Sequence, residues 1–78
     1  MTKVMHTDNY YYDVIRKNIR KYRKEKGYTQ AKLANESDLS VDYITEIESL
    51  RKNKSFSIAT LGRIADALDI KIENFFKE

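Results

Sequence analysis

Apolar residues recur along this chain at helical spacing, in short runs that polar residues separate. The first run extends from a cap at Asp8 or Asn9 to about Lys26, and it presents one apolar stripe. The side chains of this stripe are Tyr12, Ile15, Ile19 and Tyr22. Gly27 ends the predicted helix, because glycine readily takes the left-handed conformation that follows a helix.

Two shorter helices follow, and each is predicted to begin after a residue whose hydroxyl group caps the first turn. Thr29 precedes a helix over residues 30 to about 37, and Ser40 opens a helix that runs to about Glu48 or Ser49. The residues expected to face inward are Leu33, Ala34, Ile44 and Ile47.

The turn between these two helices is only three residues long, Ser37-Asp38-Leu39. Asp38 is able to take the left-handed conformation that a tight turn needs, and Leu39 can fill the corner with an apolar side chain. Two short helices joined in this way have the geometry of a helix-turn-helix unit, whose second helix reads the major groove of DNA.

The C-terminal part predicts two more helices behind a basic loop over residues 50–55 (LRKNKS). Ser57 caps the fourth helix, which has a clear apolar face. The residues of that face are Ile58, Leu61, Ile64, Ala65 and Leu68. The stretch from Ile70 to Lys77 predicts a short fifth helix. Its apolar residues are Ile70, Ile72, Phe75 and Phe76.

These runs predict an all-α fold in which five short helices form one compact domain over residues 9–78, behind a flexible tail of residues 1–8. Composition agrees, since the chain has no proline, only two glycines and 35% charged residues, which favours helices with one wet face. A chain of 78 residues has room for one modest core. No cysteine is present, so neither a disulfide nor a thiolate metal site can reinforce that core.

The net charge of +3 is unevenly distributed. Between Val14 and Lys54 the chain has eleven basic and six acidic side chains, whereas the remainder has four basic and six acidic ones. A concentrated positive region is the electrostatic signature of a protein that binds a polyanion. A solvated basic helix gives the same pattern, and charge alone does not separate the two interpretations.

The same composition argues against catalysis and metal binding. The only histidine, His6, lies in the predicted tail, and zinc needs three or four protein ligands. Neither a nucleophile–base pair nor a glycine-rich phosphate loop can be assembled from these residues. No apolar run approaches the roughly 20 residues of a membrane span. We therefore expect a cytoplasmic protein that is not an enzyme and that uses no cofactor, metal or membrane.

The order and spacing of these residues resemble a known family over about residues 15–76. The resemblance is to the lambda-repressor-like family, also called the Cro/phage-repressor or XRE-type helix-turn-helix family. The similar segments are Ile19–Gln30 (IRKYRKEKGYTQ), Leu33-Ala34, Leu39-Ser40, Tyr43-Ile44, Ile47-Glu48, Ser57–Leu61, Ile64–Leu68 and Ile72–Phe76. This resemblance implies a stand-alone transcriptional regulator, such as a small phage-type repressor or the controller protein of a restriction-modification system.

The predicted DNA contacts follow from placing the third helix in the major groove, which is about 12 Å wide. The helix over residues 30–37 then crosses the backbone, where Thr29, Gln30 and backbone amides can hold a phosphate. Asp42 and Glu46 repel phosphate, but a carboxylate can accept a hydrogen bond from N4 of cytosine. The predicted DNA-binding residues are Thr29, Gln30, Ser40, Val41, Asp42, Tyr43, Thr45, Glu46, Ser49, Arg51, Lys52, Asn53 and Lys54.

The resemblance also implies a structural ion pair between Arg23 and Glu48, which would orient the third helix without contacting a base. The chain departs from the usual family pattern in several places. Phe56 stands where proline is frequent, and the predicted reading face carries Asp42 and Glu46 but no arginine, glutamine or asparagine. Asp38 replaces a glycine in the turn, the loop after Glu48 is about two residues longer, and Lys71 replaces a capping serine or aspartate.

We expect a symmetric homodimer, because Phe75 and Phe76 cannot both face one small core. The predicted interface residues are Ile70, Ile72, Phe75 and Phe76. The dimer would bind an operator in double-stranded DNA, and no small-molecule effector is expected. Residues 10–12 form a tyrosine cluster that is interpreted as a half-buried helix start, with stacking on bases or on a partner as the alternative. The alternative function is a protein-interaction module of the same fold, such as an antitoxin or a repressor antagonist.

Overall fold

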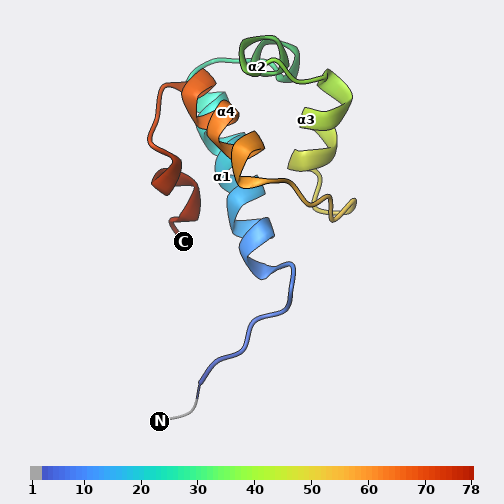
Figure 1. Ribbon diagram of the computed structural model, residues 1–78, viewed down its shortest axis with the longest axis vertical. Coiled ribbons are helices and arrows are strands. Elements are labelled where there is room, and N and C mark those ends of the chain that lie inside the picture. The colour runs from blue at the N-terminus through green and yellow to red at the C-terminus, as the bar shows by residue number, and fades with distance from the viewer. Residues whose placement is uncertain (1–2) are drawn as a thin grey trace.

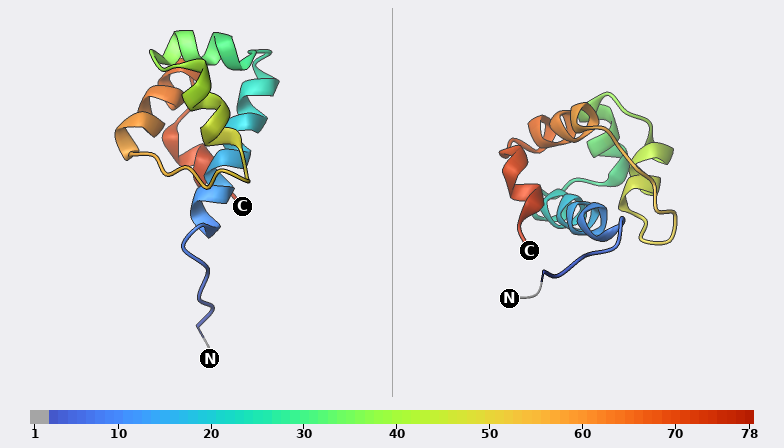
Figure 2. Two further views of the ribbon diagram at one scale, coloured as in Figure 1. Left: turned by 90° about the vertical axis from the view of Figure 1, so that its right-hand side faces the viewer. Right: turned by 60° about the horizontal axis from the view of Figure 1, so that its bottom comes forward.

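The computed structural model describes residues 3–78 as four α-helices and one 3-10 helix, with no strand in that range (Figure 1). The elements are α1 (Tyr10–Glu25), α2 (Gln30–Ser37), α3 (Val41–Glu48), α4 (Ile58–Leu68) and the 3-10 helix η1 (Ile72–Phe76). The helix α1 forms the long axis, α2 crosses one end of the molecule, and α3 and η1 lie on opposite sides of α1 (Figures 1 and 2). The predicted all-α fold is confirmed.

Three helices begin where the hydroxyl caps predicted. In α2, α3 and α4 the cap oxygen accepts the backbone N–H of the residue three positions later, at 3.0 Å in each case. The three caps are Thr29, Ser40 and Ser57. The first helix differs, because Asn9 precedes α1 as expected but its side chain makes no capping hydrogen bond.

Left-handed residues end three of the helices. Gly27 follows α1 with a φ of 79° and Asp38 follows α2 with a φ of 58°, both as predicted. Asp69 ends α4 in the same conformation, with a φ of 56°. Aspartate tolerates this conformation because its short side chain can bond locally, so the missing glycine at position 38 does not prevent a tight turn.

A single apolar core lies between the helices. Each of α1, α2, α3, α4 and η1 contributes to it, and most of the side chains are fully buried. The core residues are Ile15, Ile19, Leu33, Ala34, Ile44, Ile47, Leu61, Ile64, Ala65, Leu68 and Phe75. The predicted apolar faces of α2 and α3 are therefore confirmed.

The structure corrects the C-terminal predictions. The fifth element is a 3-10 helix of five residues, not an α-helix from Ile70 to Lys77. Lys71 precedes it and supplies no capping hydrogen bond, and a short uncapped segment favours the tighter 3-10 geometry. Ile58, predicted to face inward, is 68% exposed. It is the first residue of α4 and lies ahead of the turns that reach the core.

The predicted tail is irregular over residues 3–7 and points away from the helices (Figure 2). Residues 1–2 of that predicted tail lie outside the described residues. Among residues 3–78, no helix is long and apolar enough to cross a membrane. The same range holds no group of three or more histidine, aspartate or glutamate side chains placed to bind a metal ion.

Candidate nucleic-acid interface

The turn between α2 and α3 is fixed by hydrogen bonds that close the end of α2. The Leu39 N–H donates to the Ala34 carbonyl at 2.9 Å, and the buried Ser37 hydroxyl donates to the Leu33 carbonyl at 2.6 Å. Leu39 is half-buried and packs against the core. These contacts satisfy carbonyls that a helix end otherwise leaves open, so the angle between α2 and α3 is well defined.

The helix α3 buries one side and exposes the other. Ile44 and Ile47 are fully buried. On the opposite side, Val41, Asp42 and Thr45 are exposed. Two further residues of the predicted reading face, Tyr43 and Glu46, are half-buried. An amphipathic helix held in this way presents its polar side to solvent along its full length.

Arg23 on α1 pairs with Glu48 at the end of α3, as the family resemblance implied. The Arg23 Nε donates to Glu48 Oε2 at 2.7 Å and Nη2 donates to Oε1 at 3.0 Å. Arg23 Nη1 also donates to the Tyr28 carbonyl at 2.8 Å. The two paired side chains are 9% and 4% exposed. A buried, two-pronged pair of this kind fixes orientation as well as distance.

Gln30, predicted to hold a phosphate, also makes hydrogen bonds within the protein. Its amide nitrogen donates to Glu48 Oε1 at 3.1 Å, and its amide oxygen accepts the Thr45 hydroxyl at 3.0 Å. The side chain therefore joins the first residue of α2 to α3, and its second amide hydrogen remains available to donate. The Thr29 hydroxyl accepts the Lys32 N–H, which leaves its own hydrogen available to donate.

Arg16 is a functional residue that the sequence patterns did not reveal. It is fully buried, and its Nη1 donates to the Ile47 carbonyl at 3.0 Å and to the Lys54 carbonyl at 3.1 Å. Its Nε donates to Asp13 at 2.9 Å, and the Phe56 ring lies 5.9 Å away. Arg16 thus attaches both the last turn of α3 and the following loop to α1.

The basic loop predicted to flank the groove follows α3 directly. Arg51, Lys52 and Asn53 are exposed, and Asn53 has a left-handed φ of 50°. Lys54 is half-buried, with its Nζ 3.9 Å from Glu46 and 5.7 Å from the centre of the Tyr43 ring. Part of the positive charge in this loop is therefore balanced by the reading helix itself.

A family model described as helix-turn-helix matches residues 19–75. This chain belongs to that helix-turn-helix family. The regulator SinR of Bacillus licheniformis, described as an HTH-type transcriptional regulator, is 33% identical over 66 residues. That alignment covers 83% of this chain and 58% of SinR, so the chain spans less than two thirds of this curated relative.

Solved structures show the same fold. The restriction-modification controller protein C.AhdI from Aeromonas hydrophila superposes with a TM-score of 0.76 at 29% identity, covering 83% of this chain and 96% of that one. The controller protein C.Esp1396I, bound to a 25 base pair operator site, has a TM-score of 0.76 at 34% identity and 86% coverage of both chains. The lambda-repressor-like resemblance is confirmed by these matches.

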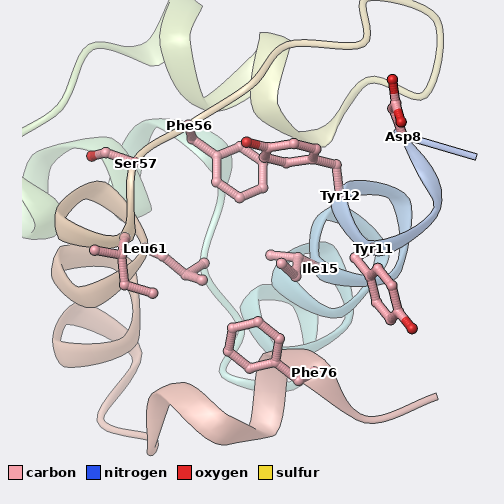
Figure 3. Close-up of a pocket in the computed structure, with 9 residues that line it drawn as sticks. Asp8, Tyr11, Tyr12, Ile15, Phe56, Ser57, Leu61 and Phe76 are labelled. Carbon is pink, nitrogen blue, oxygen red and sulfur yellow. The ribbon is translucent and has the colours of Figure 1, made fainter.

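The helix-turn-helix domain carries a second surface, an apolar pocket of about 220 Å³ away from α3. Tyr12, Ile15, Phe56 and Phe76 point toward this pocket from α1, the loop before α4, and η1 (Figure 3). Phe56 and Tyr12 meet edge to face with ring centres 5.0 Å apart. Three large apolar or aromatic residues that line the pocket are exposed. They are Tyr11, Ile58 and Phe76, at 57%, 68% and 46% exposure.

The predicted dimer residues divide between the core and the surface of the helix-turn-helix domain. Phe75 is fully buried in the core and Phe76 is exposed, in agreement with the expectation that both cannot face the core. Ile70 and Ile72 are half-buried and pack against the core. Phe76 alone is exposed. In the tyrosine cluster, the Tyr10 hydroxyl donates to Glu78 and its ring stacks on His6 at 3.7 Å.

Proposed function

We propose that this chain is a transcriptional regulator that binds double-stranded operator DNA by inserting α3 into the major groove. The proposal rests on the way in which α3 is held against the rest of the protein. Three polar side chains of α1 and α2, Arg16, Arg23 and Gln30, hold its inner side and its end, while its outer side stays open. C.Esp1396I, which shares this fold, was solved on an operator, and this similarity supports the proposal.

The proposed contacts fall into two groups. The reading group, which would meet base edges, consists of Ser40, Val41, Asp42, Tyr43, Thr45 and Glu46. The positioning group, which would meet phosphates, consists of Ser49, Arg51, Lys52, Asn53 and Lys54, with the first amides of α2. Thr29 accepts one hydrogen bond and Gln30 donates one to Glu48 within the protein. The Thr29 hydroxyl hydrogen and the second amide hydrogen of Gln30 can therefore join the backbone amides of α2 in the proposed phosphate contact.

The reading group favours a small set of bases. Asp42 is exposed at the start of α3, and its carboxylate can accept a hydrogen bond from cytosine N4. Val41, 45% exposed, can contact the methyl group of thymine. Sequence-dependent DNA shape supplies the remaining discrimination, as it does at base pairs that a protein does not touch.

We also propose a symmetric homodimer, with half-sites about 34 Å apart on the DNA. The proposed interface is the apolar pocket, because the exposed Ile58 stands beside the hollow that Tyr12 and Phe56 line. In a two-fold arrangement, the same patch on both chains must be self-complementary, and a protruding side chain next to a hollow meets this condition. This arrangement suits a phage-type repressor or a restriction-modification controller.

The DNA-binding proposal is tested by footprinting the protein on the DNA upstream of its own gene. A protected palindrome is expected there. The variant Arg51→Ala/Lys52→Ala/Lys54→Ala should weaken binding and flatten its salt dependence by about one unit for each lost phosphate contact. If this variant binds duplex DNA as tightly as the wild type, the regulator proposal fails, and the acidic side of α3 would instead serve a protein-binding module.

The dimer proposal is tested by measuring oligomeric state. Ile58→Asp places a charge on the proposed interface while leaving the core intact, since Ile58 is largely exposed. Sedimentation equilibrium should show a monomer for this variant and a dimer for the wild type. Ala59→Asp, at an exposed neighbouring position that does not line the pocket, is the matched control and should remain dimeric. A dimer that persists in Ile58→Asp contradicts this interface.

A further inference from the structure

A basic groove runs between α1 and the segment that follows α3. It has a volume of about 390 Å³ and is lined by Lys17, Arg20, Glu48, Ser49, Leu50 and Arg51. The segment after α3 passes close beside α1 (Figure 2), where Arg16 bonds to the Lys54 carbonyl. The proposed DNA contacts account for Ser49 and Arg51. They assign no role to Lys17 and Arg20, the two basic residues that α1 contributes to the groove.

The charge in this groove is not balanced from within the protein. Lys17, Arg20 and Arg51 are exposed, and none of them forms an ion pair within residues 3–78. The one acidic side chain in the lining is Glu48, which Arg23 already neutralises through two hydrogen bonds of 2.7 and 3.0 Å. The groove therefore carries about three uncompensated positive charges.

The basic residues nearer to the reading helix behave differently. Lys32 Nζ lies 2.8 Å from Glu36, and Lys54 Nζ lies 3.9 Å from Glu46. Both lysines are partly neutralised by carboxylates on their own side of the molecule. These two lysines therefore differ from Lys17, Arg20 and Arg51, which have no carboxylate partner within residues 3–78.

We propose that Lys17 and Arg20, with Ser49 and Arg51, form a phosphodiester-binding groove that takes the DNA backbone flanking the major groove read by α3. This inference rests on the proposed function and extends its footprint onto α1. A DNA strand that passes Ser49 and Arg51 at the end of α3 would also meet Lys17 and Arg20, which line the same groove from α1. Arginine offers a planar fork that matches phosphate oxygens, and lysine adds a compact charge.

The walls of the groove are held in place before any DNA arrives. Arg16 ties α1 to the Ile47 carbonyl at 3.0 Å and to the Lys54 carbonyl at 3.1 Å. The Arg23–Glu48 pair ties α1 to α3 two turns further along α1. Because both walls are fixed by buried contacts, little ordering is needed when a phosphate enters, and affinity is not lost to rearrangement.

The test compares two variants that each lose two positive charges. Lys17→Gln/Arg20→Gln removes the α1 wall of the groove. Arg63→Gln/Lys71→Gln removes two exposed basic residues on α4 and ahead of η1, outside the groove, and is the matched control. Both variants, checked for folding by circular dichroism, are titrated with the footprinted duplex and with a mixed-sequence duplex of the same length, at several salt concentrations.

The groove variant should lower the slope of log affinity against log salt by about two for each bound chain, equally on both duplexes. The control variant should keep a slope close to that of the wild type. A hydroxyl-radical footprint should lose protection only at the outer phosphates, with the protection around α3 retained. A merely destabilised protein would lose protection throughout the site.

Three outcomes would overturn the inference. If the groove variant keeps the wild-type slope, the groove does not hold DNA and is left for an anionic segment of a protein partner. If both variants flatten the slope equally, net charge alone is responsible. If the wild-type protein binds neither duplex, both the proposed function and the groove proposal are rejected. If the wild type binds DNA but either of the first two results is found, only the groove proposal is rejected.

Discussion

Arg16 and Arg23 lie two turns apart on α1, and both reach across to α3, but they bind it in different ways. Arg23 bonds to a side chain, the carboxylate of Glu48. Arg16 bonds to backbone carbonyls, those of Ile47 and Lys54. The first contact joins two charges inside the protein, whereas the second uses one charge to close the end of a helix and to hold a loop.

The difference decides which contact a sequence can reveal. A carboxylate partner must be an aspartate or a glutamate at a particular sequence position. The family resemblance can therefore identify Glu48 as the partner of Arg23. A carbonyl partner is supplied by any residue, so nothing in the sequence marks Ile47 or Lys54 as the acceptors for Arg16. The difference also separates the effects of mutation. Removing Arg23 leaves the buried Glu48 carboxylate without its ion partner, whereas removing Arg16 leaves two neutral carbonyls and the partly exposed Asp13 carboxylate without theirs.

The largest expected effect comes from breaking the charged contact on one side. Arg23→Met should lower the free energy of unfolding by about 3–5 kcal/mol, because it leaves the Glu48 carboxylate buried and unpaired. Arg23→Met/Glu48→Met should recover most of that loss, since a well-packed apolar pair of similar volume replaces the ions. Urea denaturation measures both. A double variant no more stable than the single one would mean that the pair itself carries the stability.

A smaller and more local effect is expected at the carbonyl contact. Arg16→Met should lower the free energy of unfolding by about 2–3 kcal/mol, because hydrogen bonds from a buried charged donor are lost. Amide hydrogen exchange should accelerate in the segment from Lys54 to Phe56, which Arg16 anchors. Arg20→Met, at an exposed position of the same helix, is the control and should change stability by less than about 0.5 kcal/mol. Unchanged exchange in the loop would contradict the anchoring role.

The smallest effect is expected at an exposed ion pair, which sharpens the contrast with the buried one. The hydrogen bond and the negative charge of Glu36 raise the pKa of Lys32 above its ordinary value. A raised lysine pKa stabilises the fold below the ordinary value, and that contribution disappears as the pH rises through the raised value. The contribution is therefore fully present near neutral pH, where stability does not vary with pH through this group, and it is lost only at alkaline pH.

The measurement for the exposed pair is an NMR titration of Lys32 at alkaline pH. Glu36→Gln should return the pKa of Lys32 toward its ordinary value, with little change in the urea midpoint, since exposed pairs contribute little. A large loss of stability in Glu36→Gln at neutral pH would show that exposure does not separate this pair from the Arg23–Glu48 pair.

Local signals determine most of what the sequence predicted correctly. The caps at Thr29, Ser40 and Ser57 act within one helical turn, and Asp38 takes its left-handed conformation from the turn in which it lies. The apolar faces of α2 and α3 follow from periodicity alone. The outward orientation of Val41 and Asp42 follows in turn from burial of the opposite side.

The remaining features depend on neighbours that are distant in the sequence. Periodicity places Ile58 on the apolar face of α4, but the core ends before it reaches that first turn. Gln30 is polar at a helix start, which suggests a phosphate contact, yet Glu48 and Thr45 lie within reach of its amide. Phe75 and Phe76 are adjacent and chemically alike, so only the path of η1 decides which of them is buried.

The contacts that hold α3 against the other helices do not involve its first two residues. Every buried bond to α3 attaches to its inner side or its last turn, while Val41 and Asp42 stand exposed with no ion pair in the described chain. Substitutions at these two positions therefore carry little structural penalty. If α3 binds DNA as proposed, substitutions at Val41 and Asp42 can change the sequence that is recognised while the contacts that hold α3 stay the same.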